Sequence, residues 1–342
     1  MRDADWKQAY PAFLWWTQQR TPESVTTAWR LLDRLVQEER EHQHGYLQTH
    51  WFNRVVEASR LVTTLNNQTK EPQLVVGPLE WLERFEHYSP YLLPNCATYT
   101  MVMYALIKWN NDESTAHFVE ELLVRMHEES QDGNPNVLPD VDAYNSVLYA
   151  WANSGLEEAP HRAEALLQKM REYEMEPNVV SYGTLITTWA RSSDRNAATR
   201  CEEILRQMVD QGEEPNTIIY NSVMSAWERS SRRDSAQRVD VLFREMMTLY
   251  YHHGIDNVQP DDLTLLIVLR TILRSGNVAR ADAIITQVLQ MNQEGDLNIA
   301  IPKKIFDDTL HEWANLRKSS NAGERAESLL RLMVKLYANG NN

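Results

Sequence analysis

The residues best suited to metal chemistry form two small groups without a complete set of ligands. The groups are His42, His44 and His50, and His252 with His253. A zinc site requires three or four ligands in fixed geometry, whereas each group offers two histidines at close spacing. The two cysteines, Cys96 and Cys201, are too few for a disulfide framework or a cysteine-rich zinc site. We therefore expect no metal and no cofactor.

Carboxylate pairs and nucleophile motifs do not indicate catalysis. Glu120-Glu121, Glu202-Glu203 and Glu213-Glu214 stand beside basic residues, as on a solvated helix face. The sequence contains no Gly-rich phosphate loop, no H-E-x-x-H and no G-x-S-x-G. We expect no enzymatic activity. The other residues that could take part in recognition are short polar side chains at a regular spacing.

Length and composition are those of a soluble globular chain. The 342 residues are 43% hydrophobic and 24% charged, and the formal net charge is -14. No apolar run approaches the roughly 18 to 20 residues of a membrane span, and the start, MRDADWKQAY, resembles neither a signal peptide nor a transit segment. The acidic balance argues against indiscriminate coating of phosphate backbones, and it leaves room for a local basic track.

The regularly spaced polar residues belong to a repeated phrase. Y-N-S-V-L-Y-A-W begins at Tyr144, and related phrases begin at Tyr182 and Tyr220, each 38 residues later. Weaker copies begin at Phe52, Tyr99, Leu265 and Phe306. A second phrase with a pair of large apolar residues and a methionine follows about 20 residues later, as from Arg162 to Met170, Arg200 to Met208, Arg238 to Met246 and Arg325 to Met333. Proline followed by Asn or Asp closes most units.

Each unit is predicted to be an antiparallel pair of helices, since apolar residues recur at helical spacing and proline ends the unit. One hairpin cannot bury its apolar face alone, so the pairs must stack. We expect an all-α, right-handed α-solenoid with tyrosine, tryptophan and methionine packed between repeats. The expected repeats are 1–48 (degenerate), 49–95, 96–140, 141–178, 179–216, 217–261, 262–302 (degenerate) and 303–342 (terminal). The longer steps after Tyr99 and Tyr220 predict insertions in the loops.

These phrases resemble the pentatricopeptide repeat family, and its P class in particular. The match is good from Val141 to Asp261, moderate from Thr49 to Asp140 and weak at both ends. The related tetratricopeptide pattern W-x-x-L-G-x-x-Y is not found. The resemblance implies a solenoid that binds single-stranded RNA, with one nucleotide per repeat and two or three side chains on each base.

The resemblance also implies which residues read the bases. In the family, the residue after the first-helix tyrosine acts with the residue after the closing proline. The pairs here are Asn53 with Asn95, Thr100 with Asp140, Asn145 with Asn178, Gly183 with Asn216, and Asn221 with Asp261. The family's code implies pyrimidine, G, pyrimidine, a purine-leaning position and U, from 5′ to 3′. The equivalent residues further on, Leu266 and Asp307, do not fit the code.

Two further sets of residues would hold the RNA. By resemblance, apolar residues near the start of each first helix sandwich the bases: Ala97, Val180, Ile218 and Leu263, with Asp142 departing from the pattern. Nine residues after each tyrosine-equivalent position stand Leu61, Lys108, Asn153, Arg191, Arg229, Arg274 and Asn315. Four cations in seven places predict a stripe that tracks the RNA backbone. Equally, these can be cations favoured at helix C-termini, at about 0.3 to 1 kcal/mol each.

The leading hypothesis is a sequence-selective binder of single-stranded RNA that supports organellar RNA processing, stability or translation. The alternative is a protein-interaction solenoid, or scaffold, that binds a peptide or helix on its concave face, which the acidic charge would suit. The apolar last helix, from Glu324 to Tyr337, predicts a protein partner or self-association through the C-terminal hairpin. No membrane partner is expected. The resemblance implies a mitochondrion or plastid, and the missing presequence predicts a processed or truncated chain.

Overall fold

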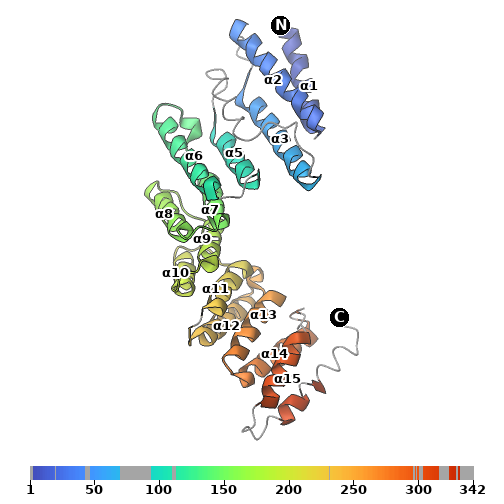
Figure 1. The fold of residues 1–342 in the computed structure, drawn as a ribbon, viewed down its shortest axis with the longest axis vertical. Helices are drawn as coiled ribbons and strands as arrows, with labels where there is room; N and C mark the ends of the chain where they lie inside the picture. The colour runs from blue at the N-terminus through green and yellow to red at the C-terminus, as the bar shows by residue number, and fades with distance from the viewer. Residues whose placement is uncertain are drawn as a thin grey trace. The chain divides into compact units, whose positions relative to one another are not determined.

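The structure is a computed structural model of the 342-residue chain. It describes residues 3–19, 21–42, 47–69, 94–109, 113–230, 232–295, 297, 299, 303–315, 323–328 and 330–331. The chain divides into two compact units, unit 1 (Met1–Pro177) and unit 2 (Asn178–Asn342). In the described ranges the regular elements are α-helices and two short 3₁₀ helices, without a strand (Figure 1). The predicted all-α fold of stacked helical hairpins is confirmed.

The described residues of unit 1 form three helical hairpins and one further first helix. Its elements are α1 (Asp3–Gln18), α2 (Pro22–His42), α3 (Thr49–Thr69), α5 (Cys96–Trp109), α6 (Glu113–Gln131), η1 (Pro135–Val137), α7 (Val141–Ser154) and α8 (Ala159–Glu172). α5 packs against α3, α6 and α7. First helices therefore contact both their hairpin partner and the first helix of the next hairpin.

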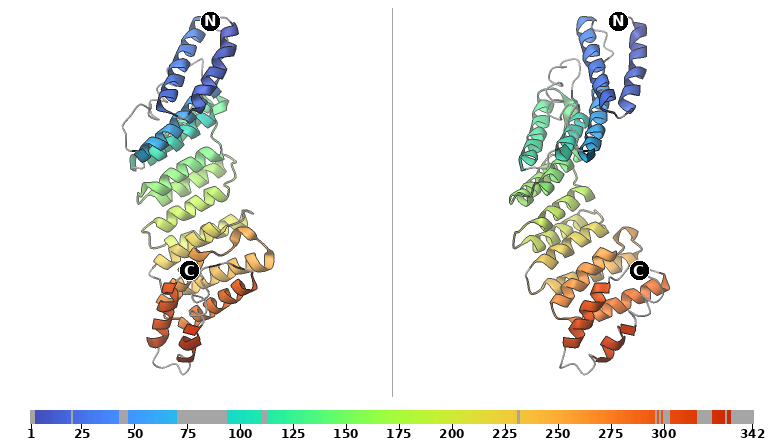
Figure 2. Two further views of the ribbon diagram at one scale, coloured as in Figure 1. Left: turned by 90° about the vertical axis from the view of Figure 1, so that its right-hand side faces the viewer. Right: turned by 45° about the vertical axis from the view of Figure 1, so that its right-hand side comes forward.

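Unit 2 repeats this arrangement. Its elements are α9 (Val179–Arg191), α10 (Ala197–Asp210), α11 (Thr217–Arg229), α12 (Ser235–His253), η2 (Asp256–Val258), α13 (Asp262–Arg274), α14 (Val278–Glu294) and α15 (Lys303–Asn315). α11 packs against α9 and α13 as well as its partners α10 and α12. Figure 2 shows the helices of each unit lying side by side as successive hairpins. The first helices α9, α11 and α13 form one layer, and the second helices α10, α12 and α14 form the other.

The closing Asn or Asp of each repeat is the N-cap of the next first helix. Asp140 accepts a hydrogen bond from the Ala143 N–H at 2.9 Å, and Asp261 accepts one from the Thr264 N–H at 2.7 Å. Asn95, Asn178 and Asn216 cap their helices in the same way. A side-chain oxygen at this position satisfies a backbone N–H that lacks a partner in the helix. The first helices that follow these caps begin at Cys96, Val141, Val179, Thr217 and Asp262.

The repeated aromatic residues form the core. Tyr144, Trp151, Tyr182, Tyr220 and Trp227 are fully buried. The leucines and methionines of the second phrase, such as Leu166, Leu167 and Met170, are buried against them. The prediction that these residues pack within the stack is confirmed. The large apolar side chains supply most of the stabilisation, because burial of each is typically worth about 1.5 to 3 kcal/mol.

Largely buried acids in the first half of the second helices link consecutive hairpins. In unit 2, Glu202 accepts from the indole N–H of Trp227 at 3.1 Å and lies 3.7 Å from Arg238. In unit 1, Glu120 makes the same contacts with Trp151 and Arg162, at 3.0 and 3.9 Å. The same positions pair Arg280 with Asp240 at 2.7 Å and Arg325 with Asp282 at 3.7 Å. The recurring Arg-x-Glu/Asp of the second phrase is therefore an inter-repeat contact.

The prediction of loop insertions after Tyr99 and Tyr220 is only partly right. The added residues lengthen the second helices, because α6 and α12 have 19 residues each against 14 in α8 and α10, and the remainder form η1 and η2. The position of glycine explains the difference. The left-handed Gly212 follows the buried Met208 closely, whereas Gly254 follows Met246 two turns later. A helix continues until a residue can adopt the left-handed conformation that ends it.

Two expectations fall outside the regions in which the structure can test them. Half of the segment from Glu324 to Tyr337 lies outside the described residues, as does His44. Among the described residues, no helix is both long enough and apolar enough to cross a bilayer. In the same ranges, no three His, Cys, Asp or Glu side chains are grouped to hold a metal ion.

Candidate nucleic-acid interface

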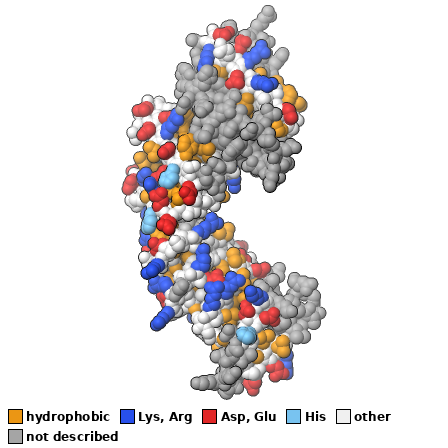
Figure 3. All heavy atoms as spheres, viewed as in Figure 1, with side chains coloured by type: hydrophobic (Ala, Val, Ile, Leu, Met, Phe, Trp, Pro, Cys, Tyr) orange, Lys and Arg blue, Asp and Glu red, His pale blue; other side chains and the backbone are white. Residues whose placement is uncertain are grey.

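The first-helix layer of unit 2 contains a groove in which six of the sequence-predicted residues meet. Its volume is about 480 Å³, and residues of α9, α11 and α13 line it. The six are Arg191, Ile218, Asn221, Arg229, Asp261 and Leu263. Figure 3 shows Lys and Arg side chains gathered on unit 2 around these helices. One polar pair, two apolar side chains and two cations therefore share one concave surface.

Asn221 and Asp261 form a fixed polar pair in this groove. The Asn221 amide Nδ2 donates to Oδ1 of Asp261 at 3.0 Å, and the Thr264 hydroxyl lies 2.7 Å from Asn221 Oδ1 and 2.8 Å from Asp261 Oδ1. Burial alone would raise the pKa of Asp261, but hydrogen bonds from Thr264, Asn221 and Leu263 outweigh it and hold that pKa below its ordinary value. The carboxylate is therefore ionised and oriented before any ligand arrives.

The same arrangement occurs in unit 1. The Asn53 amide donates to Oδ1 of Asn95 at 3.3 Å, and the Thr98 hydroxyl lies 2.8 Å from Asn53 Oδ1 and 2.9 Å from Asn95 Oδ1. Thr98 and Thr264 were not predicted as site residues. Their sequence signal is a threonine three residues after a capping Asn or Asp, as in a capping box. This threonine orients both members of the polar pair.

The pair of Thr100 and Asp140 is arranged differently. The Thr100 hydroxyl donates to the carbonyl of Cys96 at 2.9 Å, within its own helix. Burial and the charge of Asp140 raise the pKa of the Cys96 thiol to about 11. Asn145 and Asn178 belong to different units.

In the pair of Gly183 and Asn216, the glycine position has room for a larger residue. Gly183 is half-buried on α9, and a Cβ there would lie 3.5 Å from Cγ1 of Ile219. That distance is ordinary van der Waals contact. Asn216 is the N-cap of α11 and accepts from the Ile219 N–H at 3.0 Å. Glycine at this position is therefore not required by packing.

The predicted sandwiching residues are exposed. Val180, Ile218 and Leu263 have exposed fractions of 57%, 72% and 52%, and Ala97 is exposed on α5. Large apolar side chains at this repeated position are not packed into the hydrophobic core. A recurrent exposed apolar residue is more informative than an isolated one, because it suits a flat apolar ligand.

The predicted cations lie in the last turns of α5, α9, α11 and α13, and all four are exposed. Arg229 donates to the carbonyl of Ala190 on α9, which fixes its guanidinium across the groove. Arg274 lies 3.7 Å from the carboxylate of Glu228 and donates to the Glu228 carbonyl at 3.3 Å. Glu228 also lines the groove and was not predicted. Its charge offsets that of Arg274.

One family model matches the middle of the chain. The family model for the pentatricopeptide repeat domain matches residues 127–192 and 165–230. Residues 127–230 therefore contain pentatricopeptide repeats. The matched windows cover the stretch in which the repeated phrases are clearest. Among curated proteins, none matches the chain.

Solved structures of pentatricopeptide repeat proteins have low similarity to the chain. The pentatricopeptide repeat domain of Arabidopsis thaliana protein-only RNase P 1, in complex with tRNA, has 14% identity and a TM-score of 0.44, over 56% of this chain and 86% of that one. PPR10 from maize has 18% identity and a TM-score of 0.47, over 92% and 39%. PPR10 with an 18-nt psaJ RNA element has 14% identity and a TM-score of 0.40, over 94% and 54%. The chain thus spans less than two thirds of either PPR10 chain.

Proposed function

We propose that this protein binds single-stranded RNA selectively, one nucleotide per repeat, without catalytic chemistry of its own. The observation that carries the proposal is the groove of unit 2, where Asn221 and Asp261 lie with Ile218, Leu263 and two arginines. A base has a polar edge, two apolar faces and an attached phosphate. The groove offers a partner for each of these parts.

The chemistry of the Asn221–Asp261 pair favours uracil. Asn221 uses one amide N–H on Asp261, and an asparagine has a second N–H to donate. A carboxylate has further acceptor sites. Uracil presents an N3–H donor beside carbonyl acceptors, so it can donate to Asp261 and accept from Asn221. Cytosine presents an acceptor at N3, which the carboxylate would repel.

The other base-reading residues extend the proposal along the chain. We assign the pairs Asn53–Asn95, Thr100–Asp140, Asn145–Asn178 and Gly183–Asn216 to successive nucleotides, in the repeats given above. Support comes from the cap geometry, which places the second member of every pair at the start of a first helix. The organellar role, in a mitochondrion or plastid and in RNA processing, stability or translation, rests on the family resemblance.

Fluorescence anisotropy with labelled RNA tests the proposal. The matched RNA carries pyrimidine, G, pyrimidine, A and U, and the control is a scrambled RNA of the same composition. We expect tighter binding of the matched RNA, by tenfold or more since each good base contact is worth about 1 to 3 kcal/mol, and affinity that falls with salt. Equal affinity for both RNAs, or affinity independent of salt, would contradict the proposal.

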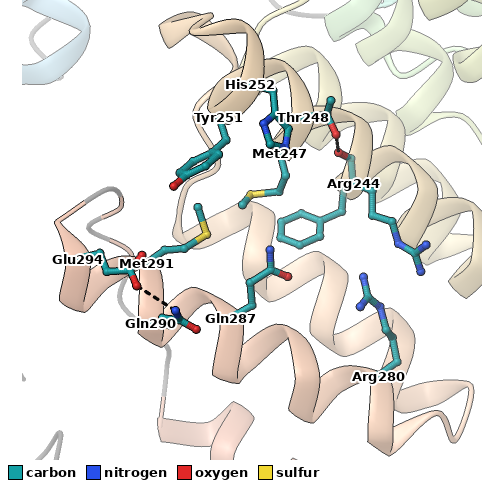
Figure 4. Close-up of a pocket in the computed structure, with 11 residues that line it drawn as sticks. Arg244, Met247, Thr248, Tyr251, His252, Arg280, Gln287, Gln290, Met291 and Glu294 are labelled. Atoms are coloured by element: carbon teal, nitrogen blue, oxygen red, sulfur yellow. Dashed lines mark hydrogen bonds between the residues drawn. The ribbon is translucent and has the colours of Figure 1, made fainter.

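A second candidate function, binding of a protein segment, is favoured by a hollow in the second-helix layer of unit 2 (Figure 4). It lies between α12 and α14 and has a volume of about 440 Å³. Its lining includes the apolar Phe243, Met247 and Met291, with Arg244 and Arg280 at one end. Both arginines pair with the single carboxylate of Asp240, which leaves an excess positive charge at this end, while Glu294 lines the hollow away from the arginines. The partner that fits is a segment with a large apolar side chain next to a carboxylate.

Paired synthetic helical peptides distinguish this second function. The two peptides share their apolar residues and carry either glutamate or lysine at the flanking position. Selective binding of the glutamate peptide, weakened by Arg244→Ala and independent of bound RNA, is the expected result. Equal binding of both peptides, or binding unaffected by Arg244→Ala, would contradict it.

A further inference from the structure

A helical stripe on each first helix joins the proposed base-reading residue to the proposed backbone cation. In α5 the stripe is Thr100, Tyr104 and Lys108, spaced four residues apart, and in α7 it contains Asn145 and Tyr149. Residues four apart lie on one face of a helix. The two tyrosines thus occupy the middle position of consecutive stripes, one turn from the base-reading residue.

The middle position faces the groove in unit 2. Thr187 and Ser225 hold it on α9 and α11, and both line the groove together with Asn221 and Arg229. The equivalent residues of α5 and α7 are aromatic, and Tyr104 and Tyr149 are each 39% exposed. The register of the repeats therefore puts two exposed tyrosines where α9 and α11 have short hydroxyl side chains.

Lys108 holds the two rings in a defined arrangement. Its Nζ lies 5.5 Å from the centre of the Tyr104 ring, on the same helix, and 5.7 Å from that of Tyr149, on the next first helix. An ammonium within about 6 Å of a ring centre attracts its π face. α5 and α7 also pack directly against each other. The two rings and the cation form one surface across two repeats.

We propose that Tyr104 and Tyr149 contact the riboses of bound RNA and that their hydroxyls recognise the 2′-hydroxyl groups. The order of groups in a nucleotide is base, ribose, phosphate, and the order along the stripe is base-reading residue, tyrosine, cation. The tyrosine therefore faces the sugar. Its phenolic group both donates and accepts, as a 2′-hydroxyl does, and this group is what distinguishes RNA from DNA at a given site. The proposal rests on the proposed RNA binding.

Single 2′-deoxy substitutions in the matched RNA test this role without changing the protein. Substitution at the nucleotide assigned to Thr100 or to Asn145 should weaken binding by about three- to tenfold, the effect of one lost hydrogen bond. The control is the nucleotide assigned to Gly183, where the Thr187 hydroxyl donates to the Gly183 carbonyl at 2.8 Å. Substitution there should have little effect.

The double variant Tyr104→Phe and Tyr149→Phe completes the test. It retains both rings for Lys108 and removes only the hydroxyls, so we expect the unsubstituted RNA to bind more weakly and the two deoxy-sensitive positions to become insensitive. If wild type binds the matched RNA but responds alike at all three positions, or the double variant keeps the same sensitivity, the ribose role is wrong while RNA binding stands. If wild type binds no RNA, the proposed function itself fails.

Discussion

Replacement of Glu228 by glutamine should tighten RNA binding and steepen its salt dependence. The Glu228 side chain is only 11% exposed in the groove of unit 2, and its carboxylate lies 3.4 Å from Arg270 and 3.7 Å from Arg274. Its charge offsets that of both arginines and opposes an incoming phosphate. Glutamine keeps the shape of the side chain and removes the charge.

The expected magnitude is that of one added phosphate contact. Each phosphate neutralised on a single strand contributes about 0.7 to the slope of log affinity against log salt. An exposed ion pair is worth about 0.2 to 1 kcal/mol, so affinity near physiological salt should rise by up to about fivefold. The gain should be the same for matched and scrambled RNA, because phosphates carry no sequence information.

Anisotropy titrations across a range of potassium chloride concentrations measure both quantities. The matched control is Glu245→Gln, which removes the same charge from α12, where the carboxylate accepts from the Tyr220 hydroxyl at 2.9 Å and pairs with Arg206 at 3.0 Å. That residue does not line the groove, so its removal should leave the slope unchanged. Weaker binding by Glu228→Gln, or the same slope in both variants, would refute the placement of phosphates beside α11 and α13.

Three further changes test the scaffold. Gly183→Ala should raise the free energy of unfolding by about 0.5 to 1 kcal/mol, because the Cβ meets only ordinary contact with Ile219; a lower melting temperature would contradict this. Glu202→Ala should cost about 2 to 3 kcal/mol in chemical denaturation, since the indole N–H of Trp227 loses its buried acceptor; a negligible cost would contradict it. The pKa of Asp261 is lowered in the fold, so the ionised carboxylate stabilises the fold above the unfolded carboxyl pKa of about 4, and this stabilisation is lost as pH falls through the folded pKa. The melting temperature of Asp261→Asn should therefore fall less than that of wild type when the pH is lowered.

Local residue patterns determine most of the fold. The helix starts were predictable because proline followed by Asn or Asp both stops one helix and caps the next. The core was predictable because the tyrosine, tryptophan and leucine positions recur at one helical face. The ends of α6 and α12 were not foreseen, although the delayed glycines Gly133 and Gly254 in the sequence mark them.

The candidate site was predictable in part. The register of the repeats predicted which residues lie in the groove of unit 2. The contacts among those residues depend on how the hairpins stack. Glu228 of α11 contacts Arg270 and Arg274 of α13, and no local sequence pattern predicts a contact between these two helices. The stripe containing Tyr104 and Tyr149 was visible in the sequence, but its meaning depends on knowing that the middle position lines the groove in unit 2.

The base preference at the nucleotide assigned to Asn221 and Asp261 tests the account most directly. Affinities are measured for four RNAs that differ only there, with wild type and with Asp261→Asn, which retains a capping side chain of the kind that Asn95, Asn178 and Asn216 supply. The account predicts that wild type prefers U over C by about tenfold. It also predicts that Asp261→Asn moves this preference toward C, because an amide can donate to the N3 acceptor of cytosine. Equal affinity of wild type for all four RNAs, or a change in preference spread over other nucleotides, would contradict it.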